Sequence, residues 1–129
     1  MTAMSPCVIG PLLHVSVIVA DTERALMFYR DVLGLDIDPT RPDLGYPGAW
    51  LQVGAQQIHL LELPNPDPTS DRPVHGGRDR HAAFGVQHID ALISRLDAAG
   101  IRYTLSKSGR RALFCRDWDG NTLEFIAEG

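Results

Sequence analysis

The chain carries the same order of elements twice, and this repetition constrains its fold more than any other feature. Each half begins with an alternating apolar strand, continues with an apolar helix that ends at a glycine, and closes with further strands. The spacing of matched residues is nearly constant: Gly34 and Gly100 are 66 residues apart, His14 and His81 are 67 apart, and His59 and Glu124 are 65 apart. We therefore expect an internal duplication of two βαβββ modules.

The first half shows the patterns of a strand, a helix and a hairpin. Residues 12–19 alternate, with Leu13 and the valines on one side and His14 on the other. An apolar stripe at spacing three to four follows, with Asp21 or Thr22 placed to cap a helix and Gly34 placed to end it. After a loop rich in proline and glycine at 38–48, the runs 50–53 and 57–63 predict a hairpin.

The second half follows a linker at 64–80 that is rich in proline and glycine. The elements that we expect there are a strand at 81–86, a helix from about 90 to 99 that ends at Gly100, and strands near Tyr103, at 112–116 and at 122–127. The sequence thus predicts an α+β fold in a single domain, 1–129, made of module 12–63, linker 64–80 and module 81–127. Its two tandem modules form a curved mixed sheet around a cavity, with helices on the outer face.

Composition narrows the range of partners. The 129 residues are 44% hydrophobic and 22% charged, with a net charge of −4, so the chain can form a buried core without disulfides or a structural metal ion. It has no cluster of Lys or Arg, and no apolar run approaches the ~20 residues of a membrane helix. We expect no nucleic-acid or membrane partner. Cys7 and Cys115 imply no disulfide framework and favour reduced thiols in the cytoplasm.

Four residues with metal-binding side chains occupy matched positions in the repeat. His14 and His81 lie on the opening strand of each half, and His59 and Glu124 lie on a later strand. In the strands that open and close the pattern, the ligand candidates alternate with apolar neighbours and so share the less apolar face. One face of the sheet is then a core and the other lines a cavity.

Such a set suits one divalent transition metal: Fe, Mn, Ni, Co or Zn. His14, His81 and Glu124 would form a facial set of two histidines and one carboxylate, which leaves positions for substrate oxygens. His59 is then the fourth ligand or an acid/base beside the metal. Glu62 competes for that role, but it lies three residues further on and points to the opposite face. A lone histidine on a strand is more often a hydrogen-bonded interior residue, so the set of four carries the prediction.

Other polar and aromatic residues lack this context. His75 in the linker and His88 before a helix are expected to be solvated. Tyr46 and Trp50 flank the proline-rich loop, and three cationic side chains precede the last hairpin, where they are either substrate ligands or solvated surface: Lys107, Arg110 and Arg111. Cys115 is expected to be a buried small apolar residue, and the carboxylates of residues 117–121 are expected to shape a turn.

At these residues the sequence resembles the vicinal-oxygen-chelate superfamily, which includes glyoxalase I, methylmalonyl-CoA epimerase, extradiol dioxygenases, fosfomycin resistance enzymes and metal-free bleomycin resistance proteins. The resemblance covers about residues 12–127 and is carried by the opening strand HVSVIVAD at 14–21, the helix ALMFYRDVLGL at 25–35, the strand that begins at His81, and DWDGNTLEF at 117–125. It implies paired βαβββ modules with metal ligands at His14, His59, His81 and Glu124.

The resemblance implies a shared way of binding substrate rather than one reaction. Differences from particular members of the family narrow the choice of reaction. Glyoxalase I usually has Glu or Gln where this chain has His59. The phosphonate-binding residues of fosfomycin enzymes are not reproduced at Ser108, Ala112 and Phe114. Relatives of two modules commonly form dimers, and in some the site is shared between subunits. We therefore expect a homodimer, with the site closed either within one chain or between two.

The leading functional expectation is a glyoxalase-like lyase or isomerase that acts on a small α-hydroxycarbonyl or related oxygen-chelating substrate. Glu124 would move the proton, with His59 able to share that role, so these two are the expected catalytic residues; no organic cofactor is expected. An extradiol-type dioxygenase and a small-molecule-binding protein of the antibiotic-resistance type are the alternatives.

Overall fold

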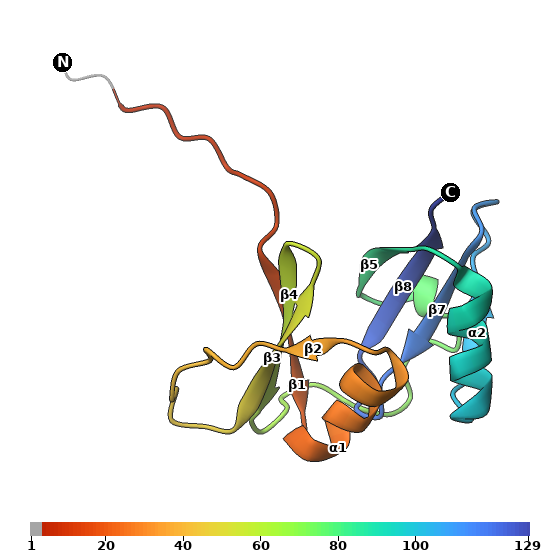
Figure 1. The fold of residues 1–129 in the computed structure, drawn as a ribbon, viewed down its shortest axis with the longest axis horizontal. Helices are drawn as coiled ribbons and strands as arrows, with labels where there is room; N and C mark the ends of the chain where they lie inside the picture. Colours follow the sequence, from red (N-terminus) through yellow and green to blue (C-terminus); the bar gives the residue numbers. More distant parts are fainter. Residues whose placement is uncertain (1–3) are drawn as a thin grey trace.

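Each half of the chain forms its own four-stranded sheet in the computed structural model, which describes residues 4–129 (Figure 1). The elements of the first half are β1 (His14–Val19), α1 (Thr22–Leu26), η1 (Met27–Val32), β2 (Asp36–Ile37), β3 (Gly48–Val53) and β4 (Gln56–Glu62). Those of the second half are η2 (Gly76–Arg78), β5 (His81–Val86), α2 (Ile89–Ala98), β6 (Tyr103–Leu105), β7 (Ala112–Arg116) and β8 (Thr122–Ala127).

The two sheets have the same topology. Their strand orders are β1-β4-β3-β2 and β5-β8-β7-β6, and in each the opening strand pairs in parallel with the last strand while the other pairs are antiparallel. The predicted α+β duplication is therefore confirmed. The eight strands form two separate sheets, not one continuous curved sheet, and the sequence analysis assigned no strand to the two residues of β2.

The first helix begins and ends as its sequence predicts. The Asp21 side chain accepts a hydrogen bond from the Arg24 amide at 2.9 Å, which caps α1, and Gly34 ends the segment at φ +77°. Between them η1 has π-helical geometry, with the Leu33 amide bonded to the Phe28 carbonyl five residues earlier. This segment carries two fully buried aromatic side chains, Phe28 and Tyr29, into the core.

The core lies on the helix-facing side of both sheets. In the first half it is built from Val19, Leu51, Ile58 and Leu60, and in the second from residues such as Leu96, Leu113 and Leu123. The alternation of β1 and β4 leaves their opposite face to side chains such as His14 and His59, whereas β7 is buried on both faces. None of the helices in residues 4–129 combines the length and hydropathy that crossing a membrane requires.

Hydrogen bonds join the two halves at the turn that precedes β8. The Tyr29 hydroxyl donates to Asp117 at 2.7 Å, and the Asn121 side chain donates to the Ile18 carbonyl at 2.9 Å. Burial raises the pKa of Asp117, against the lowering effect of the hydrogen bonds from Tyr29 and Asn121. The carboxylates of this turn are structural, as the sequence indicated.

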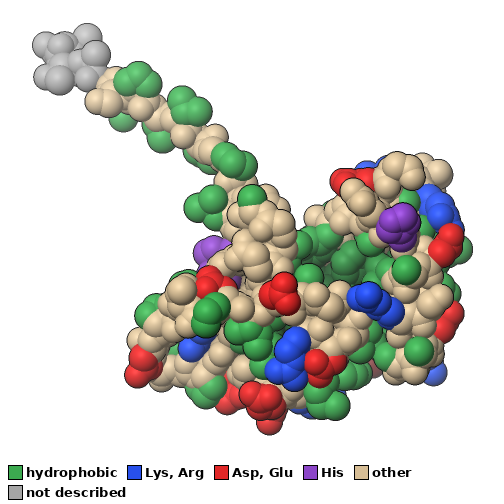
Figure 2. Space-filling view, in the orientation of Figure 1, with side chains coloured by type: hydrophobic (Ala, Val, Ile, Leu, Met, Phe, Trp, Pro, Cys, Tyr) green, Lys and Arg blue, Asp and Glu red, His purple; other side chains and the backbone are tan. Residues whose placement is uncertain are grey.

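The surface between the two halves is hollowed and apolar. Figure 2 shows hydrophobic side chains in the hollow between the two lobes. A groove between the halves is lined by residues of both sheets, of α2 and of the segment after η1: Leu33, Leu35, Val53, Ile58, Phe84, Gly85, Val86, Leu92 and Phe125. The halves are thus joined at the turn 117–121 and leave an apolar groove between their sheets.

Candidate metal-binding site

The first half places two of the four predicted ligands in contact. The His14 and His59 rings stack at 3.9 Å between centroids, and Trp50 stacks on the other face of His59 at 4.4 Å. The register explains this arrangement, because Trp50 on β3 lies directly opposite His59 on β4, and β4 runs beside β1. Strand pairing therefore builds a three-ring stack on the polar face of the first sheet.

A chain of amide groups fixes the orientation of the His59 ring. Gln57 donates through its Nε2 to Asp38 at 2.8 Å and to the Gln52 side chain at 2.9 Å, so its Oε1 is left as an acceptor. His59 Nε2 lies 2.8 Å from this oxygen and must carry the proton. The lone pair of His59 is then on Nδ1. Ligand histidines in metal sites are commonly oriented by such a second hydrogen bond.

The electrostatic surroundings favour a neutral His59. Its pKa is lowered, first by burial and then by the neighbouring His14 and by the Arg41 guanidinium, with a smaller opposing effect of Asp38. A neutral imidazole is the form that binds a metal ion.

The second half brings the other two predicted ligands together. His81 Nε2 lies 3.3 Å from Glu124 Oε1, across the parallel pair β5 and β8. His81 Nδ1 lies 2.8 Å from the Asp79 carbonyl oxygen, which can only accept, so Nδ1 carries a proton. In the neutral ring Nε2 then faces the carboxylate with a lone pair. His81 Nε2 and Glu124 Oε1 are then two acceptors that face each other, and a cation or proton bound between them would stabilise this arrangement.

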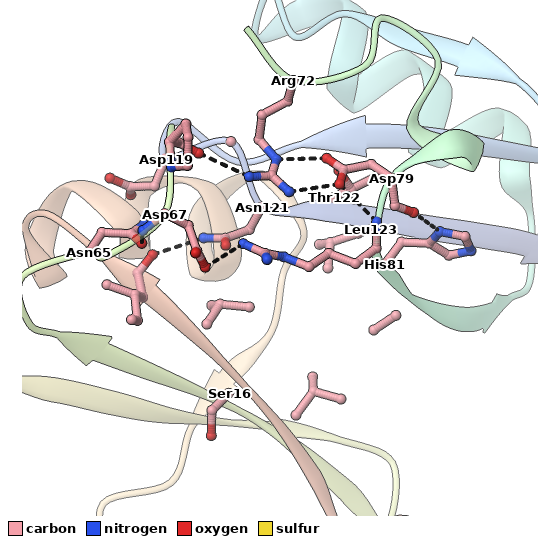
Figure 3. Close-up of a pocket in the computed structure, with 17 residues that line it drawn as sticks. Ser16, Asn65, Asp67, Arg72, Asp79, His81, Asp119, Asn121, Thr122 and Leu123 are labelled. Atoms are coloured by element: carbon pink, nitrogen blue, oxygen red, sulfur yellow. Dashed lines mark hydrogen bonds and ion pairs between the residues drawn. The ribbon is translucent and has the colours of Figure 1, made fainter. Parts of the chain in front are cut away.

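A partly buried ionic network holds the start of β5. Asp79 accepts from Arg72 Nε and Nη2, both at 2.7 Å (Figure 3). It also accepts from Arg116 Nη1 at 2.7 Å. The bonds from Arg72, with those from Arg116, hold the pKa of Asp79 well below its usual range, against the opposing effect of burial. The carbonyl that orients His81 belongs to this anchored residue.

Glu124 has an unusual environment for a carboxylate. It is 3% exposed, and its Oε2 makes no hydrogen bond within residues 4–129. The nearest cation is Arg110, whose Nη2 lies 3.6 Å from that oxygen, within ion-pair distance but beyond hydrogen-bond geometry. Burying a charged oxygen without a hydrogen bond is costly, so this atom suits a ligand that binds from outside the chain. A divalent cation fits that position.

The four predicted ligands form two pairs, one on each sheet. Within residues 4–129 no three His, Cys, Asp or Glu side chains converge closely enough to hold a metal ion. A cavity of about 360 Å³ lies between β1 and the starts of β5 and β8, and its lining includes Ser16, His81 and Thr122 (Figure 3). The single chain therefore offers two half-sites.

The competing ligand candidate, Glu62, has a different role. Its Oε1 accepts a hydrogen bond from the Thr22 amide at 2.7 Å, at the start of α1. The carboxylate thus binds a helix N-terminus on the side of the sheet away from His59, as the spacing of three residues indicated.

His75 was expected to be solvated, and the structure places it elsewhere. Its side chain is half-buried, its Nδ1 lies 2.9 Å from the Thr104 hydroxyl, and its ring contacts Phe114 edge to face at 5.2 Å. Phe114 in turn contacts His81 at 5.0 Å. Sequence reasoning missed His75 because it lies in an irregular segment; the adjacent Gly76-Gly77 was the only local signal of a close approach.

The remaining residues occupy ordinary positions. His88 is exposed at the start of α2, and Arg111 pairs with Asp90 on the surface at 2.5 Å. Cys115 is buried, and burial raises the pKa of its thiol to about 12, which makes it unreactive.

Comparison with known proteins decides the family. Residues 12–125 match the family model of the glyoxalase/bleomycin resistance protein/dioxygenase superfamily. The chain belongs to this superfamily. The match spans both sheets and all four predicted ligands, so the resemblance inferred from the sequence is confirmed.

Relatives within the superfamily carry different activities. The chain is 31% identical to glyoxylase I 4 of Arabidopsis thaliana over 128 residues, which is 95% of this chain and 73% of that protein. It is 32% identical to a lactoylglutathione lyase of Haemophilus influenzae over 126 residues, 89% of this chain and 90% of that protein. It is also 32% identical to the mitochondrial methylmalonyl-CoA epimerase of Mus musculus, but over 70% of this chain and half of the epimerase.

Solved structures show the same fold. A glyoxalase family protein from Bacillus anthracis superposes with a TM-score of 0.78 at 25% identity, covering 97% of this chain and all of that one. A mutant fosfomycin resistance protein from Listeria monocytogenes, solved with Mn(II) and a dihydroxypropylphosphonic acid, superposes with a TM-score of 0.71 at 20% identity, covering 95% of each chain.

Proposed function

We propose that the chain is a metal-dependent enzyme of the superfamily that binds one divalent transition ion through His14, His59, His81 and Glu124. The observation that carries this proposal is the Glu124 carboxylate, which is buried beside His81 and has one oxygen that accepts no hydrogen bond from residues 4–129. The imidazole and carboxylate donors suit Fe, Mn, Co, Ni or Zn. The second hydrogen bonds of His59 and His81 support the ligand role.

The proposed site is shared between two copies of the chain in a homodimer. The two half-sites lie on different sheets and do not converge within residues 4–129, so a complete set needs a second copy. In this arrangement His14 and His59 of one copy face His81 and Glu124 of the other. A twofold axis would make two equivalent sites from one contact.

The proposed reaction is a glyoxalase-like proton transfer on a small α-hydroxycarbonyl or related substrate. When bound, the ion supplies Lewis acidity to two neighbouring substrate oxygens. Glu124 takes the proton from the adjacent carbon and returns it, because it is the carboxylate at this site. His59, held neutral by its surroundings, serves as the second proton carrier.

The names of the relatives support this reaction class. A lyase of lactoylglutathione and an epimerase of methylmalonyl-CoA both have substrates with a hydrogen next to a carbonyl or hydroxyl carbon.

The proposed location is the cytoplasm. The free thiols Cys7 and Cys115 agree with this location.

Metal analysis is the first test of this proposal. Protein purified without chelators under anaerobic conditions is expected to contain about one ion per chain, and the His14→Ala and Glu124→Ala variants are expected to lose it. A chain that contains no metal and takes up none of the five ions would overturn the enzyme proposal and leave a small-molecule-binding protein.

Exchange of the substrate hydrogen in D₂O tests the reaction class. The metal-loaded protein, incubated with the hemithioacetal of glutathione and methylglyoxal or with methylmalonyl-CoA, is expected to exchange the hydrogen next to the carbonyl of at least one of them. Glu124→Gln should abolish exchange, and full activity in that variant would contradict the role of Glu124. Consumption of oxygen with a catechol panel, without hydrogen exchange, would instead assign a dioxygenase.

A further inference from the structure

The segment from Arg72 to Asp79 is a fixed turn that lies on the second sheet. Arg72 pairs with Asp79 at 2.7 Å and so closes the segment, and Arg116 of β7 donates to the Pro73 carbonyl at 2.6 Å. A Cβ at Gly76 would lie 2.7 Å from the Thr122 side chain and 2.8 Å from Phe114 Cβ. Only a glycine allows the backbone to come this close to Thr122 and Phe114, so the segment packs directly on the sheet.

The seated turn places His75 on the same face as Glu124. His75 packs edge to face against Phe114, and its Nδ1 lies 2.9 Å from the Thr104 hydroxyl. Phe114 separates His75 from His81, which it contacts at 5.0 Å. His75 is therefore one aromatic ring beyond the metal half-site of this sheet.

The strand register shows in which direction His75 lies from Glu124. Phe114 lies opposite Glu124, and Thr104 lies opposite Phe114, so the three residues form one row across β8, β7 and β6. Neighbouring strands are about 4.8 Å apart, which puts Thr104 and the His75 that it contacts about 10 Å from Glu124. The Phe114 ring lies between the two ends of this row, so a ligand that binds beside Glu124 and reaches His75 must extend past one aromatic ring.

The polar end of His75 is available to such a ligand. The Thr104 hydroxyl can donate to Nδ1 or accept from it; when it donates, the ring proton is on Nε2, which becomes a donor. Within residues 4–129 Nε2 makes no hydrogen bond, and it is not a fully buried atom that lacks a partner. In that tautomer His75 offers its Nε2–H to an oxygen anion.

We propose that His75 is a substrate-specificity residue of this site, and that the substrate carries a carboxylate or similar oxygen anion about one ring length from its two chelating oxygens. The proposal rests on the proposed metal site, since the chelating end of the substrate is held there. Phe114 forms the wall along the middle of the substrate. The Thr104 hydroxyl holds the Nδ1 atom of His75 and so acts as a positioning group.

Binding of two matched chelators tests this inference without knowledge of the substrate. Benzohydroxamate and 4-carboxybenzohydroxamate share two vicinal oxygens and one ring, and they differ only in a carboxylate at the far end. Their affinities for the zinc-loaded protein are measured by calorimetry, because zinc is not redox-active. The wild type should bind the carboxylated probe about tenfold more tightly, as a charge-assisted hydrogen bond allows.

Variants of His75 and Thr104 give the specific outcome. His75→Phe keeps a ring but no donor and should lose the preference, whereas His75→Gln keeps a donor and should retain most of it. Thr104→Val should reduce the preference and Thr104→Ser should preserve it. The zinc content should be the same in all four variants, because none of them changes a proposed ligand.

The failures of the two proposals are distinguishable. A wild type that binds zinc but shows no preference, or a His75→Phe variant that keeps the wild-type preference, overturns the role of His75 and leaves the metal site standing. A wild type that takes up neither zinc nor any of the other four ions contradicts the proposed function itself; if another of these ions binds in place of zinc, the two probes are compared with that ion.

Discussion

The orientation and tautomer of the candidate ligands are determined by neighbouring groups that are not themselves proposed to bind metal or substrate. Gln57 fixes the tautomer of His59, the Asp79 carbonyl fixes that of His81, and Trp50 covers one face of His59. The repeat predicts the four candidate ligands, but it does not predict these supporting contacts. They depend on which side chains lie opposite each other in strands, and this register appears only in the folded chain.

Trp50 offers a test of that support. Trp50→Ala leaves the His59 ring free on one face and is expected to weaken zinc binding by about tenfold, the lower end of the effect of outer residues on metal affinity. Trp50→Phe keeps an aromatic face and should bind zinc nearly as the wild type does. Calorimetric titration measures both, and equal affinity in Trp50→Ala and wild type would show that the stack does not position His59.

Tyr29 tests the contact between the halves. Tyr29→Phe removes the phenol hydrogen bond to the buried Asp117 carboxylate, which keeps the bonds from Asn121 and from the Asp119 amide, and is expected to lower the free energy of unfolding by about 1–3 kcal/mol in urea titrations. The control is Tyr46→Phe, which alters a tyrosine of the surface loop and should be nearly neutral.

The pH dependence of this effect has a definite sign. Burial, and then the Asp117 charge, raise the pKa of the Tyr29 phenol well above its usual value. The unfolded tyrosine ionises first, at a pH of about 10, so the stability that Tyr29 contributes is present below that pH and is lost above it. A difference between wild type and Tyr29→Phe that stays constant up to pH 11 would contradict this account.

Among the elements, the segment between the two modules departs most from expectation. Its prolines and glycines indicate a linker, yet residues 72–79 are held on the second sheet by Arg72, Asp79 and Arg116. Arg116 and Asp79 are 37 residues apart in the chain. Local patterns do not report contacts of that separation, and for this reason His75 was expected in solvent.

The Arg72–Asp79–Arg116 network predicts an acid-sensitive element. The pKa of Asp79 is held below its usual range, so its stabilising contribution is complete above about pH 4 and is lost as the pH falls below that value. Asp79→Asn should destabilise the fold by about 1–3 kcal/mol at pH 7 and should weaken the decline of stability between pH 4 and pH 2.

Chemical unfolding at a series of pH values measures this effect. Asp67→Asn breaks an exposed pair with Arg80 and serves as the control, with little expected change. Parallel pH profiles of wild type and Asp79→Asn would show that the network contributes nothing specific to acid stability.

At the scale of the whole molecule, periodicity predicted what is local and repeated. The strands, both helix ends and the shared face of His14 and His59 follow from alternation, capping residues and glycine positions. The two-residue strand β2 and the π-helical η1 carry no such pattern. How the two sheets are disposed depends on a few buried contacts such as Tyr29 with Asp117, which no spacing in the sequence reveals.

In the proposed dimer each metal site is completed by residues of two copies of the chain. Mixing the His14→Ala and Glu124→Ala variants after reversible unfolding tests this arrangement. Each variant alone breaks both sites of its homodimer. A mixed dimer that shares its sites has one site with both mutations and one with neither.

The mixture is therefore expected to recover about one quarter of the wild-type metal content, the share given by random pairing of copies about a twofold axis. Recovery of that fraction, together with hydrogen-exchange activity absent from each variant alone, would support a shared site. A mixture that binds no more metal than its separate components, although the wild type treated in the same way binds about one ion per chain, would contradict it.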